Sequence, residues 1–225
     1  MTTCNYAQIS FNTIKELGKI GYLDTQGYNE NRTYNHPFYK DVFCYINVYE
    51  SLSNLSNLLL QHCAIVIPTD IDEICLYQHK ESIETYLQNG GILLSFAQNF
   101  LAWLPGNNLY VKAQTPIKDR TILASPHAIT EGIRDYDLNY IKGIKGFFSR
   151  GYFDPPKDAC VFLHDDQQHC VGYIDTTTTN GIILATAGAD LFGYPLRDNN
   201  TCRRLGINIL LWVESLLVQH KKVAS

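Results

Sequence analysis

The sequence predicts an α/β fold, with a doubly wound, mainly parallel sheet and appended β-hairpins. Short runs of consecutive apolar residues, such as AIVIP over 64–68, lack the polar face of a half-exposed strand. Amphipathic segments separate these runs, as the crossovers of a parallel sheet require. Between about Gly106 and Gly181 the pattern changes to short β-like pieces with turn signals between them, which indicates hairpins.

The first half of the chain alternates strands and helices. An amphipathic segment containing Ile14 and Leu17 precedes the first strand, and a polar loop, TQGYNENRTYNHP, follows that strand. SLSNLSNLLLQH is interpreted as a helix between the second and third strands. The three predicted strands are Lys19–Asp24, Val42–Val48 and Ala64–Pro68.

The fourth strand, ILLSF over 92–96, follows a helix that carries Ile83, Tyr86 and Leu87 at helical spacing. NGG over 89–91 is typical of a helix C-cap and turn. We expect the chain to leave this strand through a sharp turn into another helix.

The second half contains four β-like pieces before a final strand and a final helix. GIILAT over 181–186 is the last buried strand, an apolar stripe from Leu205 to Leu217 marks the helix, and DNNT over 198–201 offers its N-cap. The four pieces are TILA (121–124), GIKGFFSRGYF (143–153), ACVFL (159–163) and HCVGYID (169–175).

Size and composition favour one domain over residues 1–225, with a β-rich insertion over 106–181. The net charge of −4, without a basic run, gives no reason to expect a nucleic-acid partner. No signal peptide or membrane span is recognisable, so we expect a cytoplasmic protein without membrane association. The seven cysteines form no C-x-x-C pair, which favours free thiols. Nothing here predicts a cofactor.

Several phrases in their order along the chain resemble the class I glutamine amidotransferase-like superfamily, which has a flavodoxin-like doubly wound sheet. Within this superfamily, the chain resembles most the ThuA-like and other non-amidotransferase branches. The likeness covers roughly residues 19–217. It rests on CAIVIPTD, YLQNGGILLSF, SPHAITEGI and GIILATAGADLFG before NILLWVES.

One departure from this resemblance bears on chemistry. True amidotransferases place a cysteine at the turn after the fourth strand, where backbone N–H groups stabilise an oxyanion. Here the turn reads Ala97, Gln98, Asn99, and none of these side chains attacks a carbonyl. Ser95 comes too early and is expected to lie in the sheet. The usual thiolate route of glutamine hydrolysis is therefore excluded.

Polar residues follow the predicted strands at the edge where doubly wound sheets bind ligands. Carboxylates, amides and hydroxyls of this kind hydrogen-bond polyols, although the same residue types also cap helices. We predict a ligand site that also includes Arg197. The strand-end candidates are Asp24, Gln26, Thr69, Asp70, Gln98, Asn99 and Asp190.

His127 is the candidate acid/base, because the position it matches in the resembling families faces the site, and Asp190 is the second catalytic candidate. A turn histidine bonded to the backbone is the alternative for His127. HDDQQHC over 164–170 contains metal-ligating residue types, but hairpin-turn chemistry explains it and no third ligand is identifiable, so we predict no metal site.

Arginines at 197, 203 and 204 stand near the start of the last helix, where cations are unfavourable. They either pair with Asp190, Asp198 or Glu214, or form a site for a phosphate or carboxylate.

Two functions are compatible with the sequence. The first is a binding domain for a small polar, carbohydrate-like ligand or a protein partner, with homo-oligomers possible. The second is a ThuA-like enzyme acting on a sugar or sugar derivative, with His127 as acid/base. We favour the first, because the turn after the fourth strand carries no nucleophile.

Overall fold

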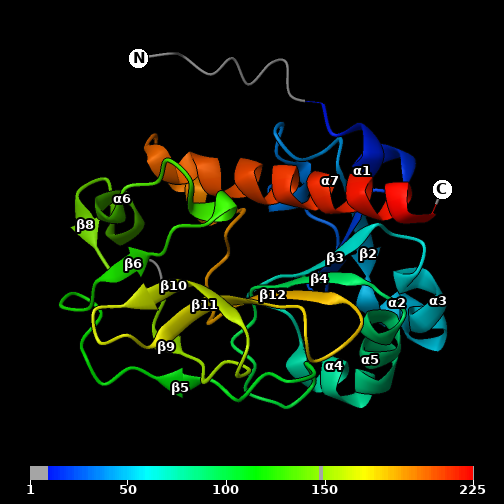
Figure 1. Cartoon of the computed structure of the whole chain (residues 1–225), viewed down its shortest axis with the longest axis horizontal. Helices are drawn as coiled ribbons and strands as arrows, with labels where there is room; N and C mark the ends of the chain where they lie inside the picture. Colours follow the sequence, from blue (N-terminus) through cyan, green and yellow to red (C-terminus); the bar gives the residue numbers. More distant parts are fainter. Residues whose placement is uncertain (1–9, 147–148, 225) are drawn as a thin grey trace.

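The computed structural model describes residues 10–146 and 149–224. Its centre is an eight-stranded sheet in the order β2-β1-β3-β4-β12-β11-β10-β6, with helices on both faces (Figure 1). The predicted α/β architecture is confirmed.

The five strands β2, β1, β3, β4 and β12 are parallel. Every residue of β1, β3 and β4 is buried, and the apolar runs of β3 and β4 predict this for those two strands. Each strand begins and ends within two residues of its predicted bounds. They are β1 (Ile20–Asp24), β2 (Phe43–Asn47), β3 (Ala64–Ile67), β4 (Ile92–Ser95) and β12 (Ile182–Thr186).

The β-rich segment forms hairpins and also widens the sheet. β11 (Cys170–Asp175) pairs antiparallel with β12, followed by β10 (Cys160–Asp165) and β6 (Ile122–Ala124). Residues 147 and 148 of the predicted piece 143–153 lie outside the described part of the chain. Two small antiparallel pairs complete the segment, β5 (Val111–Lys112) with β9 (Gly151–Tyr152) and β7 (Tyr140–Ile141) with β8 (Ile144–Lys145).

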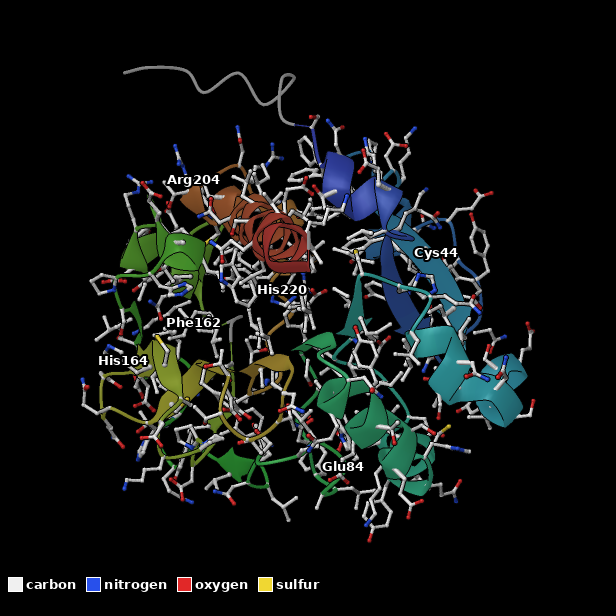
Figure 2. All side chains as sticks on the ribbon, turned by 45° about the vertical axis from the view of Figure 1, so that its right-hand side comes forward. Cys44, Glu84, Phe162, His164, Arg204 and His220 are labelled. Carbon is white, nitrogen blue, oxygen red and sulfur yellow. The ribbon has the colours of Figure 1, made fainter. Side chains whose placement is uncertain are left out.

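Helices cover the two faces with separate apolar cores. α1 (Asn12–Glu16) and α7 (Arg204–Ala224) lie on one face, where the α7 stripe packs around Ile14 (Figure 1). The helices on the opposite face fill the second core. Arg204 and His220 mark the two ends of α7 in Figure 2. The remaining helices are α2 (Val48–Ser51), α3 (Leu55–Leu59), α4 (Glu73–Gln78), α5 (Lys80–Gln88) and α6 (Asp135–Asn139).

Short 3₁₀ turns connect several of these elements. They are η2 (Thr33–Asn35), η3 (Leu52–Asn54), η4 (Ala128–Thr130), η5 (Tyr194–Arg197) and η6 (Thr201–Arg203). In the described parts of the chain, no helix has the length and apolar character needed to cross a membrane.

Two local predictions are wrong. The helix expected over SLSNLSNLLLQH divides into α2, η3 and α3, and near the first break Ser51 Oγ donates to the main-chain oxygen of Asn47 at 2.8 Å. The helix expected after β4 does not form, and residues 96–110 are an irregular loop. Glu73 of α4 holds that loop by accepting hydrogen bonds from the backbone N–H of Asn99 (2.9 Å) and Leu101 (3.2 Å).

Candidate functional site

A polar cleft of about 590 Å³ lies at the carboxyl ends of β1 and β3, between the loop after β1 and the segment after β12. Its size suits a small-molecule ligand. Charged and polar side chains dominate its lining, as expected where the strands of a doubly wound sheet end. They include Glu30, Asn31, Arg32, Thr33, Asn35, His36, Thr69, Asp70, Asp190 and Arg197.

Arg32 is bound by two carboxylates. Its guanidinium donates to Asp24 from Nε and Nη2, both at 3.2 Å, and to Asp70 from Nη1 (2.6 Å) and Nη2 (3.1 Å). Asp24 is fully buried, so Arg32 supplies the charge that compensates it. The hydrogen bonds to Asp70 raise the pKa of Arg32 although burial opposes them. The arrangement fixes one wall of the cleft.

The polar loop after β1 folds around an aromatic anchor. Tyr34 is buried against Tyr22, with ring centroids 5.1 Å apart, and its hydroxyl accepts a hydrogen bond from the backbone N–H of Asn29. Asp24 also accepts from the backbone N–H of Gln26 at 2.7 Å. These contacts carry Arg32 back over the strand end.

Asp190 lines the cleft, and backbone N–H groups of the following turn hold its carboxylate. Its Oδ1 accepts from the backbone N–H groups of Phe192 (2.9 Å) and Gly193 (2.8 Å). A Cβ on Gly193 would lie 2.2 Å from Oδ2, so only glycine fits there. Burial raises the pKa of Asp190, while those N–H groups and the charge of Arg197 oppose the rise. A carboxyl group perturbed in this way within a cleft is a candidate for function.

His36 and Arg197 add titratable and cationic groups to the same cleft. The His36 Nδ1 accepts from the backbone N–H of Phe38 at 3.3 Å. Burial, followed by the charge of Arg203, lowers the pKa of His36, so the ring is neutral at pH 7. Arg197 is exposed at the cleft mouth.

The structure brings five of the nine predicted site residues to this cleft or its wall and places a sixth beside it. Thr69, Asp70, Asp190 and Arg197 line it, and Asp24 anchors Arg32 behind it. Gln26 Nε2 lies 3.5 Å from the main-chain oxygen of Asp70, at the edge of the cleft.

Gln98 and Asn99 are not among the lining residues. Gln98 packs against Gly188, where a Cβ would lie 2.6 Å from the Gln98 Cγ. Asn99 adopts a left-handed backbone conformation (φ 55°) and is buried. Its side-chain atoms have no hydrogen-bond partner within the described residues. The turn is therefore filled by its own side chains.

His127 lies in a different hollow, of about 510 Å³, beside η4. Its Nδ1 accepts from the backbone N–H of Ile129 at 3.1 Å, and its own backbone N–H donates to Thr130 Oγ1 at 3.1 Å. Burial lowers the pKa of His127. The backbone-bonded turn histidine, the alternative considered from the sequence, describes this geometry, and the pairing of His127 with Asp190 in one site does not occur.

The HDDQQHC segment builds an ion-pair network across the β10–β11 hairpin. Asp165 is buried and accepts from Arg120 Nε at 2.9 Å and lies 3.0 Å from His169 Nδ1. Arg120 is also buried and donates to the main-chain oxygens of Ser149 and Gly151. Among residues 10–146 and 149–224, no cluster of three or more His, Cys, Asp or Glu side chains suits a metal ion.

Burial raises the pKa values of several cysteine thiols. The pKa reaches about 12 for Cys63, Cys170 and Cys202, so these thiols stay protonated near neutrality. No cysteine is among the described residues that line the polar cleft.

Sequence reasoning missed Arg32 and His36. Both lie in the polar loop after β1, where an arginine close to an acidic strand end was the available signal for an ion pair. The pairing itself depends on how the loop folds back over Asp24.

Comparison with solved structures identifies the fold. The chain is similar to the crystal structure of a protein provisionally assigned as a GMP synthase subunit, from Thermoplasma acidophilum, with a TM-score of 0.57 and 15% identity over 92% of this chain and 98% of the other. Neither the protein-family models nor the curated proteins searched match the chain. The likeness supports the α/β fold predicted from the sequence.

Proposed function

We propose that this amidotransferase-like domain binds a small, polar, carbohydrate-like ligand in the cleft between Arg32, Asp70, Asp190 and Arg197. The observation that carries the proposal is the preorganised clamp in which Arg32 bridges Asp24 and Asp70, in a cleft that Asp190 also lines. The turn after β4 lacks a nucleophile, so the proposed function is ligand binding without a covalent step.

The chemistry of the lining favours hydroxyl-rich ligands. Carboxylate oxygens of Asp70 and Asp190 accept from ligand hydroxyls, and Arg197 donates to them. Ligand hydroxyls both donate and accept, so they satisfy groups of opposite kind that lie side by side. A purely apolar ligand would leave these groups unpaired, which costs binding energy.

The first prediction concerns Arg197. Isothermal titration with a panel of monosaccharides, uronates and polyols is expected to identify a ligand whose Kd rises about tenfold in Arg197→Gln, because a charge-assisted hydrogen bond is lost. Arg150→Gln is the matched control, since Arg150 is exposed and does not line the cleft. Absence of binding by every compound in the panel, or equal weakening in both variants, would contradict the proposal.

The second candidate function is a ThuA-like enzyme that acts on a sugar derivative. The observation favouring it is Asp190, whose pKa is raised by burial and which lines the cleft. In this reading Asp190 transfers the proton, and His36 is the second titratable group in the cleft.

This alternative predicts that Asp190→Asn lowers turnover of a responsive sugar derivative by about 100-fold or more, since general acid or base catalysis contributes on that scale. His127→Gln is expected to leave turnover unchanged, because His127 lies in the hollow beside η4. Turnover that depended on His127 and not on Asp190 would reverse these roles.

A further inference from the structure

A hollow of about 460 Å³, distinct from the one beside η4, lies at the start of α7. We propose that it binds a phosphate monoester carrying a flat apolar group. It is separate from the polar cleft, with which it shares only Leu196 among the described lining residues. Residues before α6, around η6 and at Phe38 form its walls.

Its charge distinguishes it from the rest of the molecule. Three guanidinium groups line it, from Arg134, Arg203 and Arg204, and its described lining contains no carboxylate. The whole chain carries a net charge of −4, so the positive charge of this hollow is opposite in sign to that of the protein as a whole. Guanidinium groups bind phosphate through paired hydrogen bonds.

Two of these arginines retain free donors. Arg203 donates from Nε to the main-chain oxygen of Asp198, and within the described residues neither Arg203 nor Arg204 forms an ion pair. Arg134 differs, since it pairs with the buried Asp137 at 2.9 Å. Arg203 and Arg204 both line the hollow and keep unused hydrogen-bond donors, although the Arg204 guanidinium also lies close to Gly132.

The start of α7 already holds one internal carboxylate, since Asp137 Oδ2 accepts from the backbone N–H of Thr201 at 3.0 Å. Arg203 and Arg204 stand where the 21-residue helix α7 begins, which is the positive end of its dipole. Figure 2 labels Arg204 there, next to the green segment that contains α6. The backbone N–H groups of Thr201 and Cys202 already donate to Asp137 and Asn200, so a bound phosphate would be stabilised by the guanidinium groups.

The apolar part of the hollow defines the rest of the ligand. The Phe38 side chain is 49% exposed, and Leu196 and Ile207 also line this hollow. A flat apolar group beside the phosphate would cover Phe38, whereas inorganic phosphate would leave it in water.

His36 links the polar cleft to the hollow at the start of α7. Its ring lies 5.2 Å from Phe38 and 5.9 Å from Tyr39, centroid to centroid, and both aromatic residues line the hollow at the start of α7. His36 itself lines the polar cleft. A dianion placed beside Arg203 would offset that cation and favour the imidazolium form of His36.

The test is titration of the full chain with phenyl phosphate, inorganic phosphate and phenol at fixed ionic strength. Phenyl phosphate is expected to bind more tightly than either of the others. Arg203→Gln/Arg204→Gln is expected to raise its Kd by about tenfold or more, because two charge-assisted contacts are lost. Binding of phenyl phosphate is expected to move the NMR titration midpoint of His36 to higher pH.

Matched variants separate this site from the polar cleft. Arg197→Gln lies in the first cleft, and Arg150→Gln lies in neither; both are expected to keep the wild-type Kd for phenyl phosphate within about twofold. Loss of binding in Arg197→Gln alone would assign phosphate to the first cleft and overturn the inference. Equal affinity for phenyl phosphate and inorganic phosphate would overturn the apolar component. Thermal unfolding of each variant checks that it is folded.

Discussion

Arg120→Met is expected to lower the free energy of unfolding by about 3 to 5 kcal/mol, measured by urea denaturation. Arg120 and Asp165 are 3% and 1% exposed, so the substitution leaves a buried carboxylate without its guanidinium partner. It also removes donors to the main-chain oxygens of Ser149 and Gly151. Three segments of the β-rich half lose a common attachment.

The effect depends on pH in a defined direction. Burial would raise the pKa of Asp165, but the backbone N–H of His169 and the guanidinium of Arg120 outweigh it and hold the pKa below its ordinary value. The contribution of the pair is therefore full above about pH 4 and is lost as the pH falls through the folded pKa. The difference in free energy of unfolding between wild type and Arg120→Met should therefore become smaller in acid.

Arg150→Met is the control for this prediction, since its exposed side chain should change stability by less than about 0.5 kcal/mol. Adding Asp165→Asn to Arg120→Met removes the unpaired charge and should restore part of the loss. An Arg120→Met protein destabilised by less than about 1 kcal/mol would show that water compensates Asp165.

Arg32→Met is expected to destabilise the protein by about 2 to 3 kcal/mol and to weaken binding in the polar cleft by about 100-fold. Asp24 is fully buried and loses both donated hydrogen bonds, while Asp70 is released from its fixed position. Urea denaturation and isothermal titration with the ligand found for the wild type measure the two effects.

Arg197→Gln separates these effects, because Arg197 is exposed and its loss should weaken binding without a comparable change in stability. In Arg32→Met/Asp24→Asn the buried charge is gone, so stability should recover while binding does not. If Arg32→Met bound the ligand as tightly as the wild type, the contacts of Arg32 with Asp24 and Asp70 would have no part in ligand binding.

The parallel strands were predictable because burial on both faces demands unbroken apolar runs. β3 and β4 each end one residue before their predicted ends, at Ile67 and Ser95. The loop after β4 was not predictable, since Phe100, Trp103 and Leu104 have the apolar spacing of a helix. What decides its conformation is the Glu73 carboxylate, which lies more than twenty residues earlier in the chain.

The candidate site was predictable where it depends on strand ends and not where it depends on loops. Asp70 and Asp190 follow buried strands, so the sheet alone brings them to one edge. Arg32 reaches Asp24 only after Tyr34 has anchored its loop, and local sequence does not encode such a contact. His127 shows that matching a motif position is not sufficient to place a residue in the cleft, because it lies in the hollow beside η4.

The Glu73 carboxylate limits the chemistry that the turn after β4 can support. Its oxygens already occupy the amides of Asn99 and Leu101, and burial raises the pKa of the group against the hydrogen bonds from those amides. A thiol installed at this turn by a single substitution would meet amides already neutralised by an internal anion. Before these amides could stabilise an oxyanion, a second change would be needed, at residue 73.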